Sequence, residues 1–256
     1  MRKYWEYYKI AVRNQTAYKV DIVVNIASNM VFFYVFFALW VRIFSQNGIS
    51  EINTYSLSMT VTYYLITTVI FRLVPWDAIY LNQDVWSGYF TNDLIKPWNA
   101  RVVQFLATMG ETLTSFVYGI PVLVVVFLTV GKYLVLPDAL HAISFVITLL
   151  IGFFLIMSFV LIFHSFVFYF GDQDPNIGIV TYLLMFLSGG VFPLGFLPEK
   201  TRVIFESLPF KYIFDVPTNM FLNKFDSTEI ALIWLKMILW TLVFLWNLFG
   251  RIQKRT

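Results

Sequence analysis

The chain has 256 residues, of which 59% are hydrophobic and only 13% are charged. A soluble domain of this length could not cover so much apolar surface with polar side chains, so the composition favours an integral membrane protein. A net charge of +3 without a long Lys/Arg run argues against nucleic acid as a partner, and the absence of cysteine excludes a disulfide scaffold and a thiolate metal site.

Six apolar stretches are about as long as a helix needs to cross roughly 30 Å of hydrocarbon at about 1.5 Å per residue. The sequence therefore predicts an all-α integral membrane protein with six transmembrane helices, at about residues 22–44, 55–75, 103–130, 139–168, 176–194 and 229–250. Gly131 and Pro137 indicate a tight turn between the third and fourth spans. Asp174 and Pro175 are typical of the start of a helix before the fifth.

The distribution of basic residues predicts how the chain is oriented. Lys and Arg concentrate near both ends of the chain, and cytoplasmic segments of membrane proteins carry an excess of these residues. An even number of spans also puts both ends on one side of the bilayer. We therefore expect a multi-pass protein of the cell membrane with both termini in the cytoplasm. Charges and tyrosines occupy the start of the chain where a cleavable signal would need its apolar core, so we expect none.

Residues 1–256 are predicted to form a single transmembrane domain. Three segments of it are not predicted to span the membrane. Residues 1–20 alternate aromatic and basic side chains, which predicts an interfacial helix on the inner leaflet. Residues 76–101 are predicted to form a cytoplasmic loop. Residues 195–227 are apolar but interrupted by glycine and proline, which predicts an extracellular re-entrant helical hairpin that packs on the bundle.

Charged residues inside the predicted spans are candidate functional positions. Glu111 lies about eight positions into the third span, so roughly 12 Å from its start, and a carboxylate at that depth is expected to face a translocation path or a partner. The alternative is a helix that begins later and leaves Glu111 at the inner interface. Arg72 and Lys236 are predicted to snorkel to the lipid headgroups.

The small residues Ser188, Gly189 and Gly190 precede Pro193 in the fifth predicted span. Small residues allow close approach of helices in membranes, so these positions are candidates for dimer or re-entrant packing. A local kink ahead of the proline is the alternative. Under either interpretation the fifth span breaks at this point.

Motifs that would indicate an enzyme are absent from the sequence. It contains no GxxxxGK[ST] phosphate-binding loop, no GxSxG nucleophile motif and no HExxH zinc motif. We therefore expect no catalytic residue, no metal site and no ATPase in this chain. Any ATP-driven transport would then require hydrolysis by another chain.

The order of several short motifs resembles that of the ABC-2 type permeases, the membrane subunits of ATP-driven exporters. The motifs are Asp77, Asp84, Ser87-Gly88, Leu94-Ile95-Lys96-Pro97, Ser188-Gly189, Pro193-Leu194, Pro198, Leu208-Pro209-Phe210 and Pro217. The resemblance covers essentially the whole chain, and the order and spacing of the motifs make it specific. One departure from the family pattern is an acidic turn, with Asp172 and Asp174 and no basic residue, between the fourth and fifth spans.

The resemblance implies a coupling helix in the cytoplasmic loop 76–101. Two permeases, alike or different, would pair with two copies of an ATP-binding cassette ATPase subunit. ATP and Mg²⁺ would bind to that partner, and this chain would hold no cofactor. The residues expected to contact the ATPase are Asp77, Asp84, Trp86, Gly88, Tyr89, Leu94, Lys96 and Pro97. Aromatic side chains are frequent anchors of such interfaces, and an ordinary solvated loop is the alternative for this segment.

The predicted function is that of the permease subunit of an ATP-driven exporter. The aromatic, weakly charged spans suit an amphipathic substrate such as a drug, a peptide or a lipid, moved outward across the cell membrane. The alternatives are an ATP-independent channel, a lipid scramblase and a membrane scaffold protein.

Overall fold

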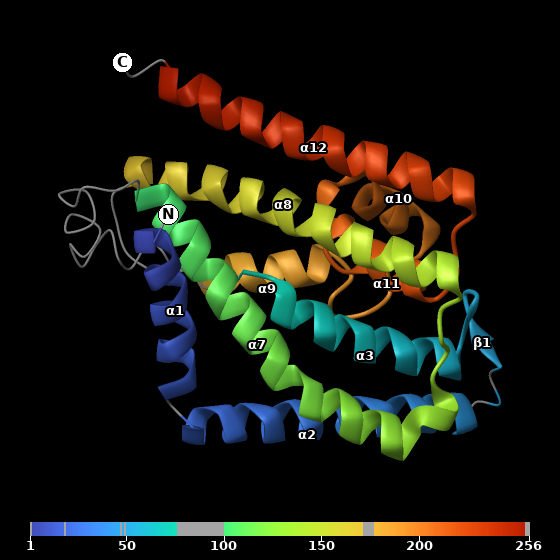
Figure 1. The fold of residues 1–256 in the computed structure, drawn as a ribbon. Helices are drawn as coiled ribbons and strands as arrows, with labels where there is room; N and C mark the ends of the chain where they lie inside the picture. The colour runs from blue at the N-terminus through green and yellow to red at the C-terminus, as the bar shows by residue number, and fades with distance from the viewer. Residues whose placement is uncertain are drawn as a thin grey trace.

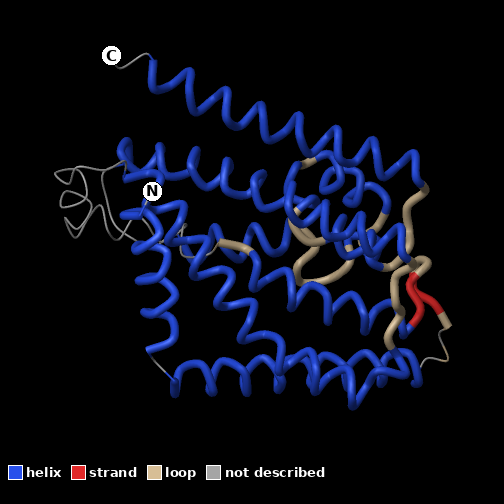
Figure 2. The backbone as a smooth tube through the Cα atoms, in the orientation of Figure 1, coloured by secondary structure: helices blue, strands red, loops and turns tan. Residues whose placement is uncertain are grey.

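The computed structural model describes residues 2–17, 19–46, 48, 50–75, 100–170 and 177–253. These residues are almost entirely helical, and one pair of two-residue strands lies at the edge of the molecule (Figure 2). The elements are α1 (Arg2–Ala17), α2 (Lys19–Gln46), β1 (Glu51–Ile52), β2 (Tyr55–Ser56), α3 (Leu57–Leu73), α7 (Ala100–Val130), η1 (Gly131–Tyr133), α8 (Ala139–Phe170), α9 (Ile177–Leu187), η2 (Leu194–Phe196), α10 (Glu199–Ser207), η3 (Pro209–Tyr212), α11 (Asp215–Phe221) and α12 (Ser227–Gln253). The predicted all-α class is confirmed.

Four of the described helices, α2, α7, α8 and α12, are long and apolar enough to cross a membrane. They correspond to the first, third, fourth and sixth predicted spans. Large apolar side chains on these helices point outward: Phe32, Leu128 and Trp246 are 67%, 77% and 81% exposed. Such exposure suits a protein whose surroundings are lipid rather than water.

The helices at the second and fifth predicted spans are shorter than expected. α3 has 17 residues, because Tyr55 and Ser56 pair with β1 instead and the Ser56 hydroxyl caps the helix by accepting a bond from the Met59 N–H at 3.3 Å. α9 has 11 residues and ends at Leu187, although apolar residues continue beyond it. At about 1.5 Å per residue the two helices extend roughly 25 Å and 17 Å.

α3 runs through the middle of the bundle, between α2 and α7 on one side and α8 and α11 on the other (Figure 1). Val61 of α3 belongs to an apolar cluster with Val126 of α7, and Ile70 belongs to another with Val160 of α8. Protein therefore covers α3 on most sides, whereas α2 and α12 lie at the periphery. Burial of a helix by protein lets it carry threonine side chains that bond back to its own carbonyl groups, as Thr60 and Thr62 do.

The segment between α9 and α12 folds into four short helices beside the β1–β2 hairpin (Figure 1). Its prolines divide it as expected: α10 follows Pro198 and η3 begins at Pro209. α1 and the C-terminal end of α12 lie toward the opposite end of the bundle. α1 packs on α7, and its position at a lipid interface stays a prediction.

The predicted coupling residues, from Asp77 to Pro97, fall in residues 76–99, which lie outside the described residues. The acidic turn at residues 171–176 does so too. Both assignments stay predictions.

Candidate functional site

Asp215, the first residue of α11, is the centre of a buried polar network and is only 8% exposed. Its Oδ1 accepts hydrogen bonds from the N–H of Leu194 at 3.1 Å and from the Tyr63 hydroxyl at 3.0 Å, and its Oδ2 accepts one from the Asn219 amide at 3.0 Å. Burial raises the pKa of Asp215, and these three donors oppose that shift. The donors offset the cost of removing a carboxylate from water.

The chain after α9 wraps closely around this carboxylate. The Tyr63 hydroxyl also bonds the Gly189 carbonyl oxygen at 2.7 Å, and the Asp215 N–H donates to the Ser188 carbonyl at 2.9 Å. Gly189 has a φ of +83°, and a Cβ built there would lie 2.8 Å from both Asp215 Cβ and the Tyr63 hydroxyl. Glycine is therefore required here both for its backbone conformation and for space. These contacts lie within one chain, and a role of Ser188, Gly189, Gly190 and Pro193 in dimer or re-entrant packing stays a prediction.

The network continues from α11 to the β hairpin. The Tyr55 hydroxyl donates to Asn219 Oδ1 at 2.7 Å. Nζ of Lys224 lies 3.0 Å from the centre of the Tyr55 ring, a cation–π contact, and donates to the carbonyl and hydroxyl oxygens of Thr54 at 3.4 and 3.3 Å. Burial lowers the pKa of Lys224 to about 8, with Asp215 and Glu51 opposing the shift.

A cavity of about 610 Å³ opens beside this network, between the β1–β2 hairpin, α10, η3, α11 and α12. Its charged lining comprises Glu199, Arg202, Glu206, Lys211, Asp215, Lys224 and Lys236. Tyr55, Tyr212 and Phe225 add aromatic walls. The cavity is therefore polar and charged although it lies at the end of an apolar bundle.

His141, at the start of α8, helps to position the cavity wall. Its Nε2 lies 2.9 Å from the carbonyl oxygen of Phe225, and its Nδ1 lies 2.7 Å from Oδ1 of Asp138. These contacts tie α8 to the loop that precedes α12. Within the part of the chain that the structure describes, no three His, Cys, Asp or Glu side chains gather as metal ligands would.

A second polar contact joins α2, α3 and α7. Arg72 is 9% exposed and donates to Asn25 Oδ1 and to the Ser115 carbonyl, each at 3.3 Å. Gly119 leaves room for this side chain, since a Cβ there would lie 2.6 Å from Cδ of Arg72. The prediction that Arg72 snorkels to the headgroups is wrong, because its guanidinium ends between helices of the bundle.

Glu111 lies one turn before Ser115 on α7. The helix begins at Ala100 and its candidate span at Leu106, so Glu111 lies inside the span rather than before it. Its side chain is partly buried and interacts with a neighbouring group. Its assignment to the translocation path stays a prediction.

A comparison with protein families gives one match that covers most of the chain. The model of the ABC-2 family transporter proteins matches residues 24–250. The chain belongs to the ABC-2 transporter family. The comparison with curated proteins gave no match. The resemblance that the sequence motifs indicated is therefore confirmed, and this ABC-2 protein is a multi-pass membrane protein. Membrane proteins of this family lack an ATPase of their own and work with an ATP-binding subunit.

No motif in the sequence of this ABC-2 protein predicted the buried network of Tyr55, Tyr63, Asp215 and Asn219. One signal was available: Asp215 is a lone acidic residue in an apolar, aromatic stretch that would be costly to bury without partners. The donors come from α3, η2 and α11, so only the folded chain shows them together.

Proposed function

We propose that this ABC-2 protein is the permease subunit of an ATP-driven exporter in the cell membrane, and that it moves an amphipathic substrate outward. The observation that carries this proposal is the family match over residues 24–250, in a chain without a phosphate-binding motif. Hydrolysis then occurs in a separate ATP-binding subunit, present in two copies with two permeases. ATP-driven closure of those subunits shifts the permease between inward-facing and outward-facing states.

The proposal includes a six-span arrangement in which α3 and α9 belong to the second and fifth spans. Both termini are placed in the cytoplasm, which agrees with the position of α1 and the end of α12 at the same end of the bundle (Figure 1). The loop at residues 76–101 then lies on the cytoplasmic side and docks on the ATPase. The β hairpin and the charged cavity lie on the outer side.

The test is to produce the tagged chain together with an ATP-binding cassette subunit from the same organism. Recovery of both chains is measured first, then ATP-dependent movement of amphipathic dyes into inverted vesicles. Trp86→Ala and Gly88→Pro should lower both recovery of the ATPase and dye movement. Trp246→Ala is the matched control, because Trp246 is 81% exposed on α12 and its loss should leave both quantities unchanged.

Three outcomes would contradict parts of this proposal. Full recovery and full transport by both loop variants would exclude docking through the loop. Dye or lipid movement without the ATPase would favour the channel or scramblase alternative. A chain that never associates with an ATPase and moves no substrate would favour the scaffold alternative.

A further inference from the structure

Lys236 is a cation inside a membrane-spanning helix. It lies nine residues after the start of α12, roughly 14 Å along the helix at about 1.5 Å per residue, within the candidate span Ser227–Asn247. A charged side chain in such a helix is costly unless it faces a partner, a cavity or the headgroups. The structure places Lys236 on the lining of the 610 Å³ cavity.

Two further lysines, Lys211 and Lys224, line the same cavity. Among the described residues, none of the three lysines has a carboxylate oxygen within 4.0 Å. Burial lowers the pKa of Lys211; the carboxylate of Glu206 opposes this shift and the ammonium of Lys236 adds to it. Lys224 is held against the Tyr55 ring and the Thr54 oxygens, which are uncharged. Three ammonium groups thus share one cavity.

The carboxylates that line the cavity act on these lysines through space, but among the described residues none of them forms a direct ion pair with a lysine of the cavity. Asp215 already accepts bonds from Tyr63, Leu194 and Asn219. Glu206 lies 3.5 Å from the guanidinium of Arg202. Glu199 is an exposed residue of the first turn of α10. An anionic ligand would therefore meet ammonium groups that other carboxylates leave available.

Exposed aliphatic side chains lie on two of the helices that line the cavity. Val203 and Ile204 of α10 are 60% and 62% exposed, and Leu232 and Leu235 of α12 are 50% and 53% exposed. Exposed aliphatic side chains on a membrane-spanning helix suit acyl chains. An anionic pocket ligand bordered by such a surface would itself be amphipathic, with a charged head and an apolar tail.

We propose that this cavity binds a phosphate group, and that the headgroup of an anionic phospholipid in the adjacent leaflet supplies it. The phosphate is bound by the lysines that line the cavity, Lys211, Lys224 and Lys236, and the acyl chains lie along exposed aliphatic side chains of α10 and α12. The site does not depend on the exporter proposal, because it needs only the membrane-embedded chain. Clusters of lysine near a membrane surface attract anionic lipid in the same way.

The test measures lipid binding to the purified full chain by native mass spectrometry in detergent. Phosphatidylglycerol, phosphatidylcholine and inorganic phosphate are titrated separately. We expect phosphatidylglycerol to bind more tightly than phosphatidylcholine. The double variant Lys211→Gln/Lys236→Gln should bind phosphatidylglycerol about tenfold more weakly, and the charge-preserving Lys211→Arg/Lys236→Arg should bind like the wild type.

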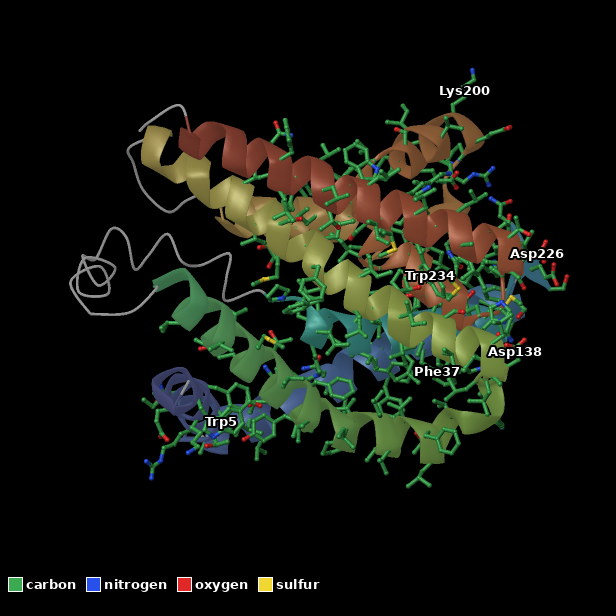
Figure 3. All side chains as sticks on the ribbon, turned by 45° about the horizontal axis from the view of Figure 1, so that its top comes forward. Trp5, Phe37, Asp138, Lys200, Asp226 and Trp234 are labelled. Carbon is green, nitrogen blue, oxygen red and sulfur yellow. The ribbon has the colours of Figure 1, made fainter. Side chains whose placement is uncertain are left out.

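Lys200→Gln is the matched control. Lys200 is an exposed residue of α10 whose side chain points away from the molecule (Figure 3), and it is not part of the cavity lining. Its loss should leave lipid binding unchanged. If the double variant is not recovered as folded protein, the single variant Lys236→Gln carries the same test, because this exposed side chain can be replaced without a buried contact being lost.

Equal binding of phosphatidylglycerol by the wild type and the glutamine variants would overturn the proposal. So would an equal loss of binding in Lys200→Gln, which would indicate attraction by overall charge. If inorganic phosphate binds the wild type as tightly as phosphatidylglycerol does, the ligand of the cavity is free phosphate and not a lipid headgroup, and the lipid assignment is wrong.

Discussion

The hydroxyl of Tyr63, in the middle of α3, bonds the carbonyl oxygen of Gly189 at 2.7 Å and also reaches Oδ1 of Asp215 at 3.0 Å. Tyr63 is fully buried, so a single side chain joins α3 to the turn after α9 and to the start of α11. The packing of α3 against the segment after α9 therefore depends in part on this hydroxyl, beside the bond from the Tyr64 hydroxyl to the Val191 carbonyl at 2.9 Å.

Replacing Tyr63 by phenylalanine should test this dependence. The change leaves two buried acceptors short of a donor, which is expected to cost about 1–3 kcal/mol of folding free energy. We expect the midpoint of thermal unfolding in detergent to fall by about 2–4 °C for each kcal/mol lost. Tyr182→Phe is the control, because Tyr182 is 72% exposed on α9 and its change should leave the midpoint in place. Equal midpoints for the wild type and Tyr63→Phe would contradict the structural role.

Gly189→Ala should be more damaging than the same change at another glycine with positive φ. At Gly189 the new Cβ would lie 2.8 Å from Asp215 Cβ and from the Tyr63 hydroxyl. The backbone strain and this steric overlap both lower the free energy of unfolding, and the overlap alone is expected to cost about 1–3 kcal/mol. Gly48 has a φ of +57° and no atom within 4 Å of its Cβ position. Gly48→Ala therefore measures the backbone strain without the overlap. Comparable losses of folded protein in the two variants, measured by thermal unfolding, would show that space at Gly189 is unimportant.

Arg72 and Gly119 should be energetically coupled. Gly119→Ala places a Cβ 2.6 Å from Cδ of Arg72, so the guanidinium must leave its bonds with Asn25 and Ser115. We expect this change to cost about 1–3 kcal/mol in the wild type and clearly less in an Arg72→Ala background. A double-mutant cycle of unfolding midpoints measures the difference. Strictly additive effects would mean that the side chain of Arg72 does not occupy the space beside Gly119.

Binding of phosphatidylglycerol should weaken in moderately alkaline solution. Burial lowers the pKa of Lys224 from 10.5 to about 8, while the carboxylates of Asp215 and Glu51 act in the opposite direction. The ammonium is therefore present below about pH 8 and is lost as the pH rises through that value. We expect affinity to be steady near neutral pH and to fall above about pH 8, with lipid binding measured as before at a series of pH values.

Lys224→Arg provides the control for this pH effect, because a guanidinium stays charged throughout the range. The variant should bind lipid at neutral pH and keep its affinity under alkaline conditions. A fall of the same size in wild type and Lys224→Arg would assign the pH dependence to another group.

Hydropathy alone predicted the all-α class and located the helices of four spans, because a helix that faces lipid has to be apolar over nearly its whole length. The same rule overestimated α3 and α9. Apolar residues continue past Ser188, but the backbone turns at Gly189, whose carbonyl accepts the bond from Tyr63. Tyr55 and Ser56, the first residues of the second predicted span, instead pair with β1, and Ser56 caps α3. Hydropathy therefore does not predict helix ends that are set by tertiary contacts.

Residue spacing placed Ser188, Gly189 and Pro193 at the break in the fifth span, and α9 ends beside them. The cause of the break is visible only in the tertiary structure, because Asp215 lies 26 residues after Gly189 and Tyr63 lies on a different helix. Arg72 shows the same limit. Its place near the end of a span predicted snorkelling. In the structure, Gly119 on α7 leaves room for the side chain between the helices, where it bonds Asn25 and Ser115.

The sequence by itself determined that this chain is a helical membrane protein of the ABC-2 family. These properties follow from its composition and from motifs that are local in the chain. Only the tertiary structure decided which polar groups meet. The network around Asp215 and the lysine-lined cavity assemble side chains from the hairpin, α3, the short helices between α9 and α12, and α12 itself. A buried charge is tolerated only where distant segments bring donors or counter-charges to it, and that proximity is a property of the fold.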